Sequence, residues 1–542
     1  MNCISNLLGA GHRIDNLKDI RRVLTKSCEN KKFKACLVSI DLNKAFDRVN
    51  HDYLWKILEK FGFPPLLINC VKKLYDIASS RIQINGFLTD SIKVKTSVRQ
   101  GCPLSMILFV LYMEPLIRKI ADSINGFWIY DKFIKVIAFA DDFNVIIRSD
   151  SEFDLLLTIF ECYSKYARIK INFLKSAFIR FNQAKIGPQR IKEVNDLKIL
   201  GVIFHRSWYT TVNSNYNSLI ANIKTTLNKH SVRNLNLYEI CWVLNIFILS
   251  KLWYVAQIFP PLNRHIAQIK TACGNFVWKN FIFRVDRQQL YLDYQKGGLK
   301  LVDPESKMKA LFIKNLLYNT NEDGNLIEEA YLFQMKTPLR LTKNGREWIE
   351  EARKVKSTLS LESTKLLYNH FVDSNNFKPK IETKIDLCWT TVWDNINQDF
   401  ISMNDRSKVF CLINDIIPNG EKLSAYSIRS MEGKCNKCGI SDTNLHRLKL
   451  CPNAKQVWDW CSQIIRTRLK YEVDDIEDIL SFEINTKAQK QKAALWLTVR
   501  AIAFNIGGTN LSLFGFKKEL REQRWNNKNN FRKTFGKYLN IC

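Results

Sequence analysis

The chain has 542 residues, which is too long for one ordinary hydrophobic core and predicts two to four domains. Hydrophobic residues make up 46% and aromatic residues 12% of the sequence, which excludes an intrinsically disordered protein. The 82 Lys and Arg residues outnumber the 52 Asp and Glu residues, giving a net charge of +30. That excess favours nucleic acid as the partner, because each cation placed on a phosphate releases counterions.

The apolar runs argue against a membrane partner. Residues 106–111 are too few to cross a bilayer, and residues 243–262 are interrupted by Lys251 and Pro260. The N-terminus has no apolar core of the signal-peptide kind. The 15 cysteines show no disulfide-like framework, so we expect a reducing compartment, with most thiols in cores and a few on metal.

The first two hundred residues predict a mixed α/β region. An apolar strand over residues 35–41 ends in Asp41, and a helix with apolar spacing begins near Asp52. Two further strands, residues 81–87 and 91–98, are expected on either side of a Thr-Asp turn.

A hairpin with two adjacent acids comes next. Apolar runs at residues 135–140 and 143–148 are separated only by Asp141 and Asp142, which predicts two paired strands. A helix should follow, with Ser151 as its N-cap. Its expected inner face consists of Leu155, Ile159, Cys162, Tyr163 and Tyr166.

These acids indicate metal chemistry only in combination. Alone, Asp41 is more often a turn or capping residue, and a pair such as Asp141–Asp142 more often faces water. Adjacent carboxylates at the tip of an apolar hairpin repel each other, however, so a fold gains nothing from both unless a cation binds. A third acid on a neighbouring strand completes an oxygen cage for two Mg²⁺ ions. An acid on one strand and an acid pair on a hairpin are the arrangement in the palm of a nucleotide polymerase, where two metal ions support phosphoryl transfer.

Five motifs, in family order, resemble those of non-LTR retrotransposon (LINE-type) reverse transcriptases. Residues 41–51, DLNKAFDRVNH, resemble the first palm motif, and residues 99–105, RQGCPLS, the second. FADD at residues 139–142 is similar to the metal-binding hairpin, NFLKS at 172–176 to the fourth motif, and LGV at 200–202 to the primer-grip segment. The resemblance implies an α+β fold, with a right-hand polymerase palm and partial fingers.

The resemblance also assigns roles to single residues. Asp41 and Asp141 would ligate both Mg²⁺ ions, with Asp142 close by. Phe46 would pack under the sugar of the incoming nucleotide and exclude a 2′-hydroxyl, although its spacing alone favours a core aromatic.

Four further residues receive roles around the nucleotide. Gln100 and Gly101 would line the nucleotide pocket, where a glycine lets the backbone approach the base pair closely. Arg13 matches an arginine of a motif near the fingers. Lys175 would protonate pyrophosphate, the alternative being an exposed lysine after a strand.

A second group of metal-ligand residues lies far downstream. Cys435, Cys438, His446 and Cys451 follow the spacing CxxC-x7-H-x4-C. Two thiolates from a CxxC turn, closed by a later His and Cys, complete a tetrahedral Zn²⁺ site with no open position, so this zinc would be structural. The alternative is a set of buried thiols beside a surface histidine.

Past about residue 206 the pattern becomes mainly helical. The segment KGGLKLVDP at residues 296–304 resembles part of the thumb in these polymerases, which would grip a template–primer duplex. We expect fingers and palm over 1–205, a thumb-like region over 206–330, a helical connector over 331–430, the zinc module over 431–465 and a basic helical region over 466–542.

Some positions depart from the family pattern. Met106 stands where the second motif normally has proline, and Ser97 where glycine is usual. Family members usually have an endonuclease and longer fingers before the palm. We therefore expect an N-terminally truncated copy, whose endonuclease would come from a missing part or in trans.

The predicted function is RNA-directed DNA polymerase (reverse transcriptase), which extends a DNA 3′-hydroxyl on an RNA template using Mg²⁺ and dNTPs. One alternative is a catalytically inactive remnant that only binds RNA or DNA, and another is a maturase-like splicing factor built on the same palm. The resemblance further implies action in the nucleus after ribonucleoprotein assembly in the cytoplasm.

Overall fold

The computed structural model divides into two compact units. One consists of residues 1–219, 254–265 and 308–364, and the other of residues 220–253, 266–307 and 365–542. The structure describes residues 10–542 except for positions 95, 100, 130–131, 188–189, 280–281, 318–342, 357–362, 374–376, 384–386, 427–432, 471–488, 508–511 and 527–542.

A five-stranded sheet forms the centre of the first unit, in the order β11-β10-β1-β9-β8. The central strand β1 (Ala35–Ile40) is antiparallel to both β10 (Ala177–Phe181) and β9 (Asp142–Ile147). Strand β8 (Val136–Phe139) pairs with β9, and β11 (Lys192–Glu193) pairs with β10. This is the mixed α/β palm that the first two hundred residues predict.

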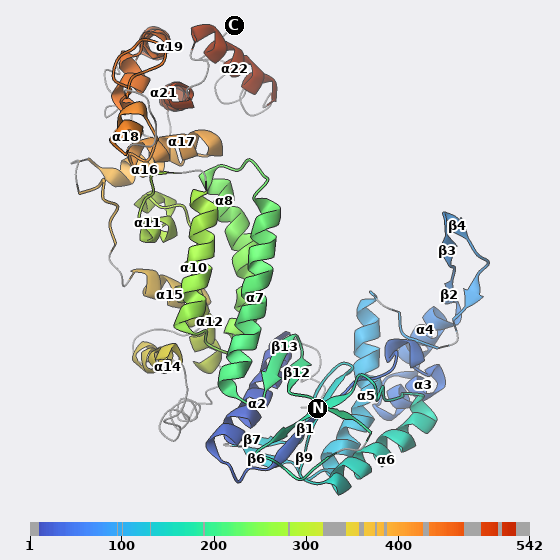
Figure 1. Ribbon diagram of the computed structural model, residues 1–542. Coiled ribbons are helices and arrows are strands. Elements are labelled where there is room, and N and C mark those ends of the chain that lie inside the picture. Colours follow the sequence, from blue (N-terminus) through green and yellow to red (C-terminus); the bar gives the residue numbers. More distant parts are fainter. Residues whose placement is uncertain are drawn as a thin grey trace. The chain divides into compact units, whose positions relative to one another are not determined.

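Helices cover both faces of β1, which explains why it is apolar throughout. Cys36, Val38 and Ile40 pack into a core with residues of α3 (His51–Lys60), α4 (Pro65–Asp76), α5 (Pro103–Ser123) and α6 (Asp150–Ala167), which Figure 1 shows around the sheet. Ala35 and Leu37 point to the opposite face and are equally buried. Helix α2 (Ala10–Glu29) joins the sheet at β8, where Asn16 Nδ2 donates to the carbonyl of Ala138 at 2.9 Å.

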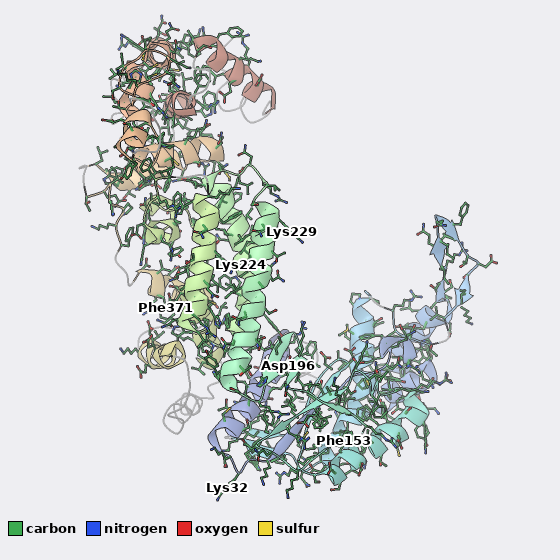
Figure 2. The ribbon with its side chains drawn as sticks, in the orientation of Figure 1. Lys32, Phe153, Asp196, Lys224, Lys229 and Phe371 are labelled. Carbon is green, nitrogen blue, oxygen red and sulfur yellow. The ribbon has the colours of Figure 1, made fainter. Side chains whose placement is uncertain are left out.

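Helix α6 begins two residues earlier than expected. Ser149, and not Ser151, is the N-cap, since its hydroxyl accepts from the backbone N–H of Glu152. The buried stripe is Phe153, Leu156, Leu157 and Phe160, with Phe153 labelled in Figure 2. The expected inner face was wrong for three residues because this bulkier stripe at helical spacing turns Leu155, Cys162 and Tyr166 to solvent.

The expected strands at residues 81–87 and 91–98 form a different hairpin. Strand β3 (Gln83–Ile84) pairs with β4 (Phe87–Leu88), and β2 (Ser79–Ser80) with β5 (Ile92–Lys93). The turn is Asn85–Gly86, with φ of 48° and 91°. The predicted Thr-Asp turn was therefore wrong, because Asn-Gly meets the need for two positive φ angles in a two-residue hairpin.

The remaining strands of the first unit form two short hairpins. These are β6 (Phe127–Ile129) with β7 (Lys132–Ile134), and β12 (Asp196–Ile199) with β13 (Val202–His205). The unit also contains residues 254–256 of α9 (Trp253–Ala256) and helix α14 (Lys343–Lys356).

The second unit is helical in its described part. Its helices are α8 (Leu237–Val243), α11 (Arg287–Tyr291), α15 (Thr364–Asp373), α16 (Trp389–Ile396), α17 (Met403–Ile413), α18 (Gly420–Ala425), α19 (Pro452–Ile464), α21 (Gln489–Gly507) and α22 (Leu513–Asn526). Five of the described helices contribute residues to both units: α7 (Trp208–His230), α10 (Asn263–Trp278), α12 (Pro304–Leu317), α9, whose Trp253 belongs to the second unit, and α15, whose Thr364 belongs to the first. A buried ion pair joins α21 to α17, where Arg500 lies 2.7 Å from Asp405.

One helical stretch, Leu237–Ala256, is long and apolar enough to cross a membrane. Half of the window that passes this test is buried, and a core helix passes it equally. The stretch therefore gives only weak evidence for a membrane.

The backbone at Ser97 is strained, which explains why the similar motif usually has glycine at this position. Its φ is 98°, a region that favours glycine, and its peptide groups are held by Val49 and His51. We expect Ser97→Gly to raise the free energy of unfolding by about 1 kcal/mol, since relief of strain outweighs the entropy that glycine adds to the unfolded chain.

Urea denaturation measures this effect, and Ser97→Ala is the matched control. Alanine removes the hydroxyl but keeps the Cβ, so it should not stabilise the chain. Equal stabilisation by both variants would show that the backbone at residue 97 is not the cause.

Candidate functional site

The pairing of β1 with β9 brings two predicted site residues opposite each other. In this antiparallel register Ile40 faces Phe143. The next residues along the two strands are Asp41 and Asp142, so the register places these carboxylates across from each other at the strand ends. Residues directly opposite in such a pair have Cβ atoms about 5 Å apart.

Asp141 lies in the two-residue turn that joins β8 to β9. Phe139 pairs with Asp142, which leaves Ala140 and Asp141 as the loop. Sequence reasoning placed both acids between the strands, whereas Asp142 is the first residue of β9. Ala140 has a φ of 53°, a strained value for a residue with a Cβ, and such strain is typical of functional turns.

The pKa of Asp142 is raised by its surroundings. Its side chain is open to solvent on one side, but neighbouring atoms still remove part of its hydration. This partial burial, followed by the negative charge of Asp141 and to a smaller extent that of Asp41, raises the pKa of Asp142, while Arg13 acts in the opposite direction.

The NFLKS motif forms a turn that holds the backbone of Asp41. The N–H of Asn172 donates to the Asp41 carbonyl at 2.8 Å. The buried Ser176 hydroxyl accepts from the Asp41 N–H at 3.1 Å and donates to the Asn172 carbonyl at 2.8 Å. Lys175 lies in this turn with an exposed side chain. Sequence reasoning missed Ser176 as a support for Asp41, although the motif contains it.

The predicted nucleotide-pocket residues lie in different settings. Phe46 is half-buried and stacks on Phe109 of α5, with ring centroids 4.3 Å apart. Gly101 has a φ of 81°, so a glycine is needed there for the backbone alone. Gln100 lies outside the described residues.

The LGV segment forms the tip of the β12–β13 hairpin. Leu200 and Gly201 have φ of 48° and 85°. The Tyr254 hydroxyl donates to the Leu200 carbonyl at 2.8 Å. Sequence reasoning missed Tyr254, because it lies more than fifty residues away in an apolar helical run that carries no motif.

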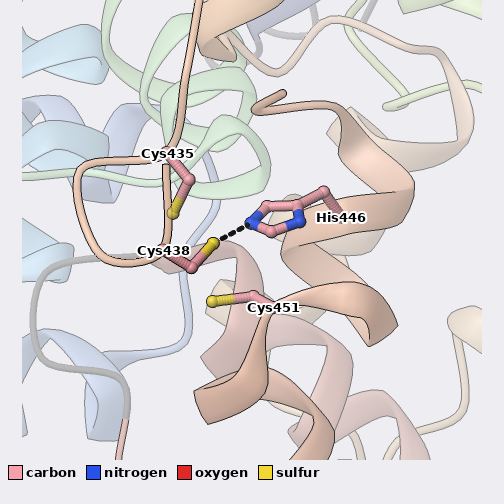
Figure 3. A group of neighbouring side chains, drawn as sticks. All are labelled: Cys435, Cys438, His446 and Cys451. Carbon is pink, nitrogen blue, oxygen red and sulfur yellow. Dashed lines mark hydrogen bonds between the residues drawn. The ribbon is translucent and has the colours of Figure 1, made fainter. Parts of the chain in front are cut away.

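The four predicted Cys and His ligands converge in the second unit. The ligand atoms of Cys435, Cys438, His446 and Cys451 all lie within 4.8 Å of one another (Figure 3). His446 is almost fully buried, with Nε2 3.2 Å from the Cys438 sulfur. Burial opposes ionisation of the Cys435 thiol, but hydrogen bonds from the backbone N–H groups of Lys437 and Cys438 lower its pKa overall.

Backbone geometry explains how this sequence closes the cluster. Gly439 has a φ of 72° and donates to the Cys435 carbonyl at 2.9 Å, which makes the tight turn after CxxC. His446 begins a π-helical turn, and the N–H of Cys451 donates back to the His446 carbonyl at 2.8 Å. The ligands therefore come from one turn and one distorted helix end.

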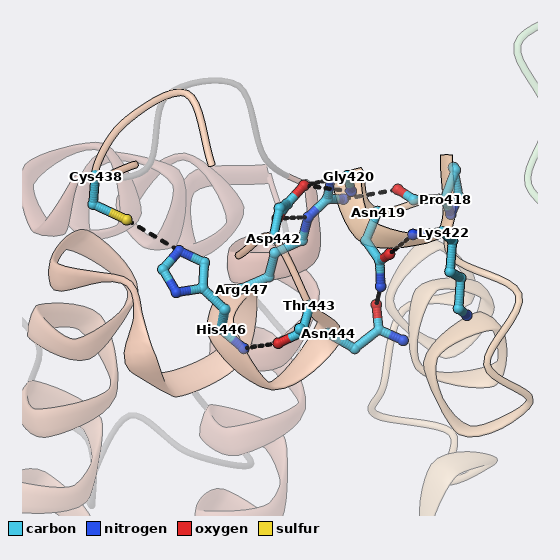
Figure 4. A network of polar contacts seen from close by, with 10 residues as sticks. All are labelled: Pro418, Asn419, Gly420, Lys422, Cys438, Asp442, Thr443, Asn444, His446 and Arg447. Carbon is cyan, nitrogen blue, oxygen red and sulfur yellow. Dashed lines mark hydrogen bonds and ion pairs between the residues drawn. The ribbon is translucent and has the colours of Figure 1, made fainter. Parts of the chain in front are cut away.

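A polar network holds the loop that carries the histidine. Asp442 accepts from Arg447 at 2.7 and 2.6 Å and from the N–H of Gly420 at 2.7 Å (Figure 4). Arg447 also donates to the Pro418 carbonyl at 3.0 Å. These hydrogen bonds lower the pKa of Asp442 although its burial opposes the shift. This support was not predicted, and no sequence signal distinguished it.

The two clusters are suited to different ions. Carboxylate oxygens suit Mg²⁺, and a cation bound among the three acids would lower the pKa of Asp142, which partial burial and the neighbouring acids raise. Three thiols and an imidazole suit Zn²⁺. The Nε2 atom of the buried His446 faces the Cys438 sulfur at 3.2 Å, so this nitrogen is the one that would bind the ion.

Comparisons with known proteins agree with these features. A family model described as reverse transcriptase (RNA-dependent DNA polymerase) matches residues 8–204. The chain is 28% identical over 251 residues to the transposon TX1 uncharacterized 149 kDa protein of Xenopus laevis, a match covering 44% of this chain and 19% of that protein. It is 29% identical over 144 residues to the retrovirus-related Pol polyprotein of the type-2 retrotransposable element R2DM of Drosophila melanogaster. That match covers 26% of this chain and 13% of the polyprotein.

The chain thus spans less than a fifth of the length of either of these curated relatives. Among solved structures, telomerase from Candida tropicalis in complex with a fragment of telomeric RNA has a TM-score of 0.32 and 15% sequence identity. That match covers 61% of this chain and 54% of the telomerase chain. A likeness at this TM-score carries no structural argument.

The raised pKa of Asp142 predicts a pH-dependent stability in the absence of divalent cations. The folded-state pKa lies above the ordinary value of 3.8, so the group favours the fold most below that value, and this contribution is lost as pH rises through the raised pKa. With a chelator present, Asp142→Asn should therefore melt at a higher temperature than the native chain at neutral pH.

Thermal melts between about pH 4 and pH 7 measure this difference. It should widen as pH rises and shrink when Mg²⁺ replaces the chelator, because the cation relieves the repulsion. A difference that is constant with pH would contradict the account of Asp142.

Proposed function

This chain carries a reverse transcriptase domain of the non-LTR retrotransposon family, and we propose that it acts as an RNA-directed DNA polymerase. The observation that carries the proposal is the β1–β9 register, which sets Asp41 opposite Asp142 beside the turn that contains Asp141. Acids from two strands and a turn then share one edge of the sheet, as a nucleotidyl-transfer site requires.

In this proposal Asp41 and Asp141 ligate two Mg²⁺ ions, and Asp142 lies beside them. Such a pair, when bound, activates the primer 3′-hydroxyl and stabilises the leaving pyrophosphate. The Asn172–Ser176 turn fixes the Asp41 backbone through two hydrogen bonds, and a third, from Ser176 to Asn172, holds the turn itself, so the backbone that carries this carboxylate is in place before any ion arrives. Lys175, exposed in the same turn, is proposed as the proton donor to pyrophosphate.

The nucleotide would bind between the first and second motifs. Phe46, held by its stack on Phe109, is proposed to exclude a 2′-hydroxyl and so to favour dNTPs. Gly101 and Gln100 are proposed to line the base-pair side of the pocket. Arg13 lies near Asp142 and would add positive charge for the triphosphate.

RNA template and DNA primer are the proposed partners of the basic surface. The net charge of +30 favours backbone contacts that do not depend on sequence. The two lysines of α7, Lys224 and Lys229 (Figure 2), are exposed, which suits the thumb role proposed for residues 206–330. Action in the nucleus, which the family resemblance implies, is part of the proposal.

The Cys/His cluster is proposed to hold one structural Zn²⁺. All four ligands come from the chain, which leaves no position open for chemistry. The zinc module proposed over residues 431–465 would then be held by its metal as well as by the Asp442–Arg447 network.

A primer-extension assay tests the polymerase. With an RNA template, an annealed DNA primer, dNTPs and Mg²⁺, the chain should extend the primer, and Asp141→Ala should lower the rate by about a thousandfold or more. The reason is that loss of a shared ligand removes several kcal/mol of transition-state stabilisation.

Asp154→Ala is the matched control, since it removes an exposed acid of α6 in the same unit. It should extend normally. Salt-sensitive binding of template–primer by the intact chain without extension would instead identify a nucleic-acid-binding remnant, and extension that depends on an intron RNA would favour a maturase-like protein.

Metal analysis tests the zinc site. The purified chain should contain about one zinc per molecule, and the paired change Cys435→Ser and Cys438→Ser should abolish it and destabilise the second unit. Cys388→Ser, at an exposed thiol outside the cluster, should leave the zinc content unchanged. An intact chain without zinc would refute the assignment.

A further inference from the structure

Helix α2 joins the acidic hairpin to a distant part of the chain within the first unit. Asn16 donates to the Ala138 carbonyl of β8 at 2.9 Å. Arg21, on the same helix, donates to the carbonyl of Ile258 at 2.8 Å. The helix thus contacts both the strand that leads into the acidic turn and the segment that follows Tyr254.

Arg13 extends this link to the tips of two hairpins. Its guanidinium carbon lies 5.4 Å from the ring centroid of Phe139 and 5.8 Å from that of Tyr254. Both distances are within the range of cation–π attraction. Phe139 is the last residue of β8, directly before the acidic turn.

Tyr254 completes the link to the second hairpin. Its hydroxyl donates to the Leu200 carbonyl at 2.8 Å, at the tip of the β12–β13 turn. Leu200 has a φ of 48° although it is not a glycine, so the turn benefits from an external contact that fixes its carbonyl. The tyrosine ring and hydroxyl thus contact different partners.

We propose that Arg13 and Tyr254 are positioning residues that fix the Leu200–Gly201 turn relative to the Ala140–Asp141 turn. The inference rests on the proposed polymerase function, in which the first turn contacts the primer and the second holds the metal ions. A link of fixed length between them sets the position of the primer 3′-hydroxyl relative to the ions. Misalignment by about an ångström at such a point slows the chemical step more than it weakens binding.

Steady-state primer extension tests this role with Tyr254→Phe, which keeps the ring and removes the hydrogen bond. We expect kcat to fall about fivefold, the cost of one ordinary hydrogen bond, while the KM for dNTP stays within about twofold. Arg13→Met should lower kcat as well. The double variant should be close to the slower single variant, because either change breaks the same link.

The Arg264–Tyr209 pair is the matched control. Its guanidinium carbon lies 5.6 Å from the Tyr209 ring centroid, in the same unit, and Arg264 also donates to Asn213 of α7. Arg264→Met and Tyr209→Phe should leave kcat unchanged. Multiplying losses in the Arg13–Tyr254 double variant, or equal losses in the control pair, would overturn the proposal.

Amide hydrogen exchange separates a failure of this link from a failure of the polymerase function. Arg13→Met should speed exchange in residues 196–205, a hairpin to which Tyr254 links Arg13. If the intact chain extends no primer, the polymerase proposal fails, and this measurement still decides the link. Unchanged exchange in both Arg13→Met and Tyr254→Phe would refute it.

Discussion

Carboxylates gathered at one edge of the sheet repel each other, and the surrounding structure holds them together against this repulsion. Strand β1 is buried on both faces and paired on both sides, so it cannot move Asp41 away from Asp142 without breaking the ladder. Ala140 accepts a strained φ to close the turn. Such strain persists only where the surrounding fold over-determines the geometry. A cation bound among the carboxylates would offset the repulsion between them.

The second cluster uses the opposite strategy. Its four ligands come from one turn and one distorted helix end, and the Asp442–Arg447 network lies beside them. Thiolates and imidazole bind zinc strongly enough to organise such a segment. The carboxylate site thus depends on its fold, whereas a zinc ion at the Cys/His cluster would contribute to the folding of its own surroundings.

The sequence could predict the elements whose signals are local. The strand ending in Asp41, the acidic hairpin and the CxxC turn each follow from spacing and turn chemistry, and the structure brings their predicted residues together. The register of α6 was wrong because two serines compete as caps, and only packing chooses the stripe that contains Phe153. The Asn85–Gly86 turn was predictable from its dipeptide but was overlooked.

Long-range contacts were beyond the reach of sequence reasoning. Tyr254 contacts Leu200 and Arg13 only because the chain returns to the first unit after residue 253. Arg13 was a candidate by resemblance, but its two ring contacts depend on tertiary structure. The roles assigned to Phe46, Gln100, Gly101 and Lys175 remain predictions.

Cleavage of the backbone by bound Fe²⁺ tests the central claim most directly. With added ascorbate and hydrogen peroxide, Fe²⁺ that replaces Mg²⁺ reduces the peroxide to hydroxyl radicals, which cut the chain close to the ion, and ascorbate reduces the Fe³⁺ back to Fe²⁺. The account predicts cuts near residue 41 and near residues 140–142 in the same sample, with both suppressed by excess Mg²⁺ and by Asp41→Asn. Cuts at only one of these segments, or at neither, would show that the acids do not share a metal site.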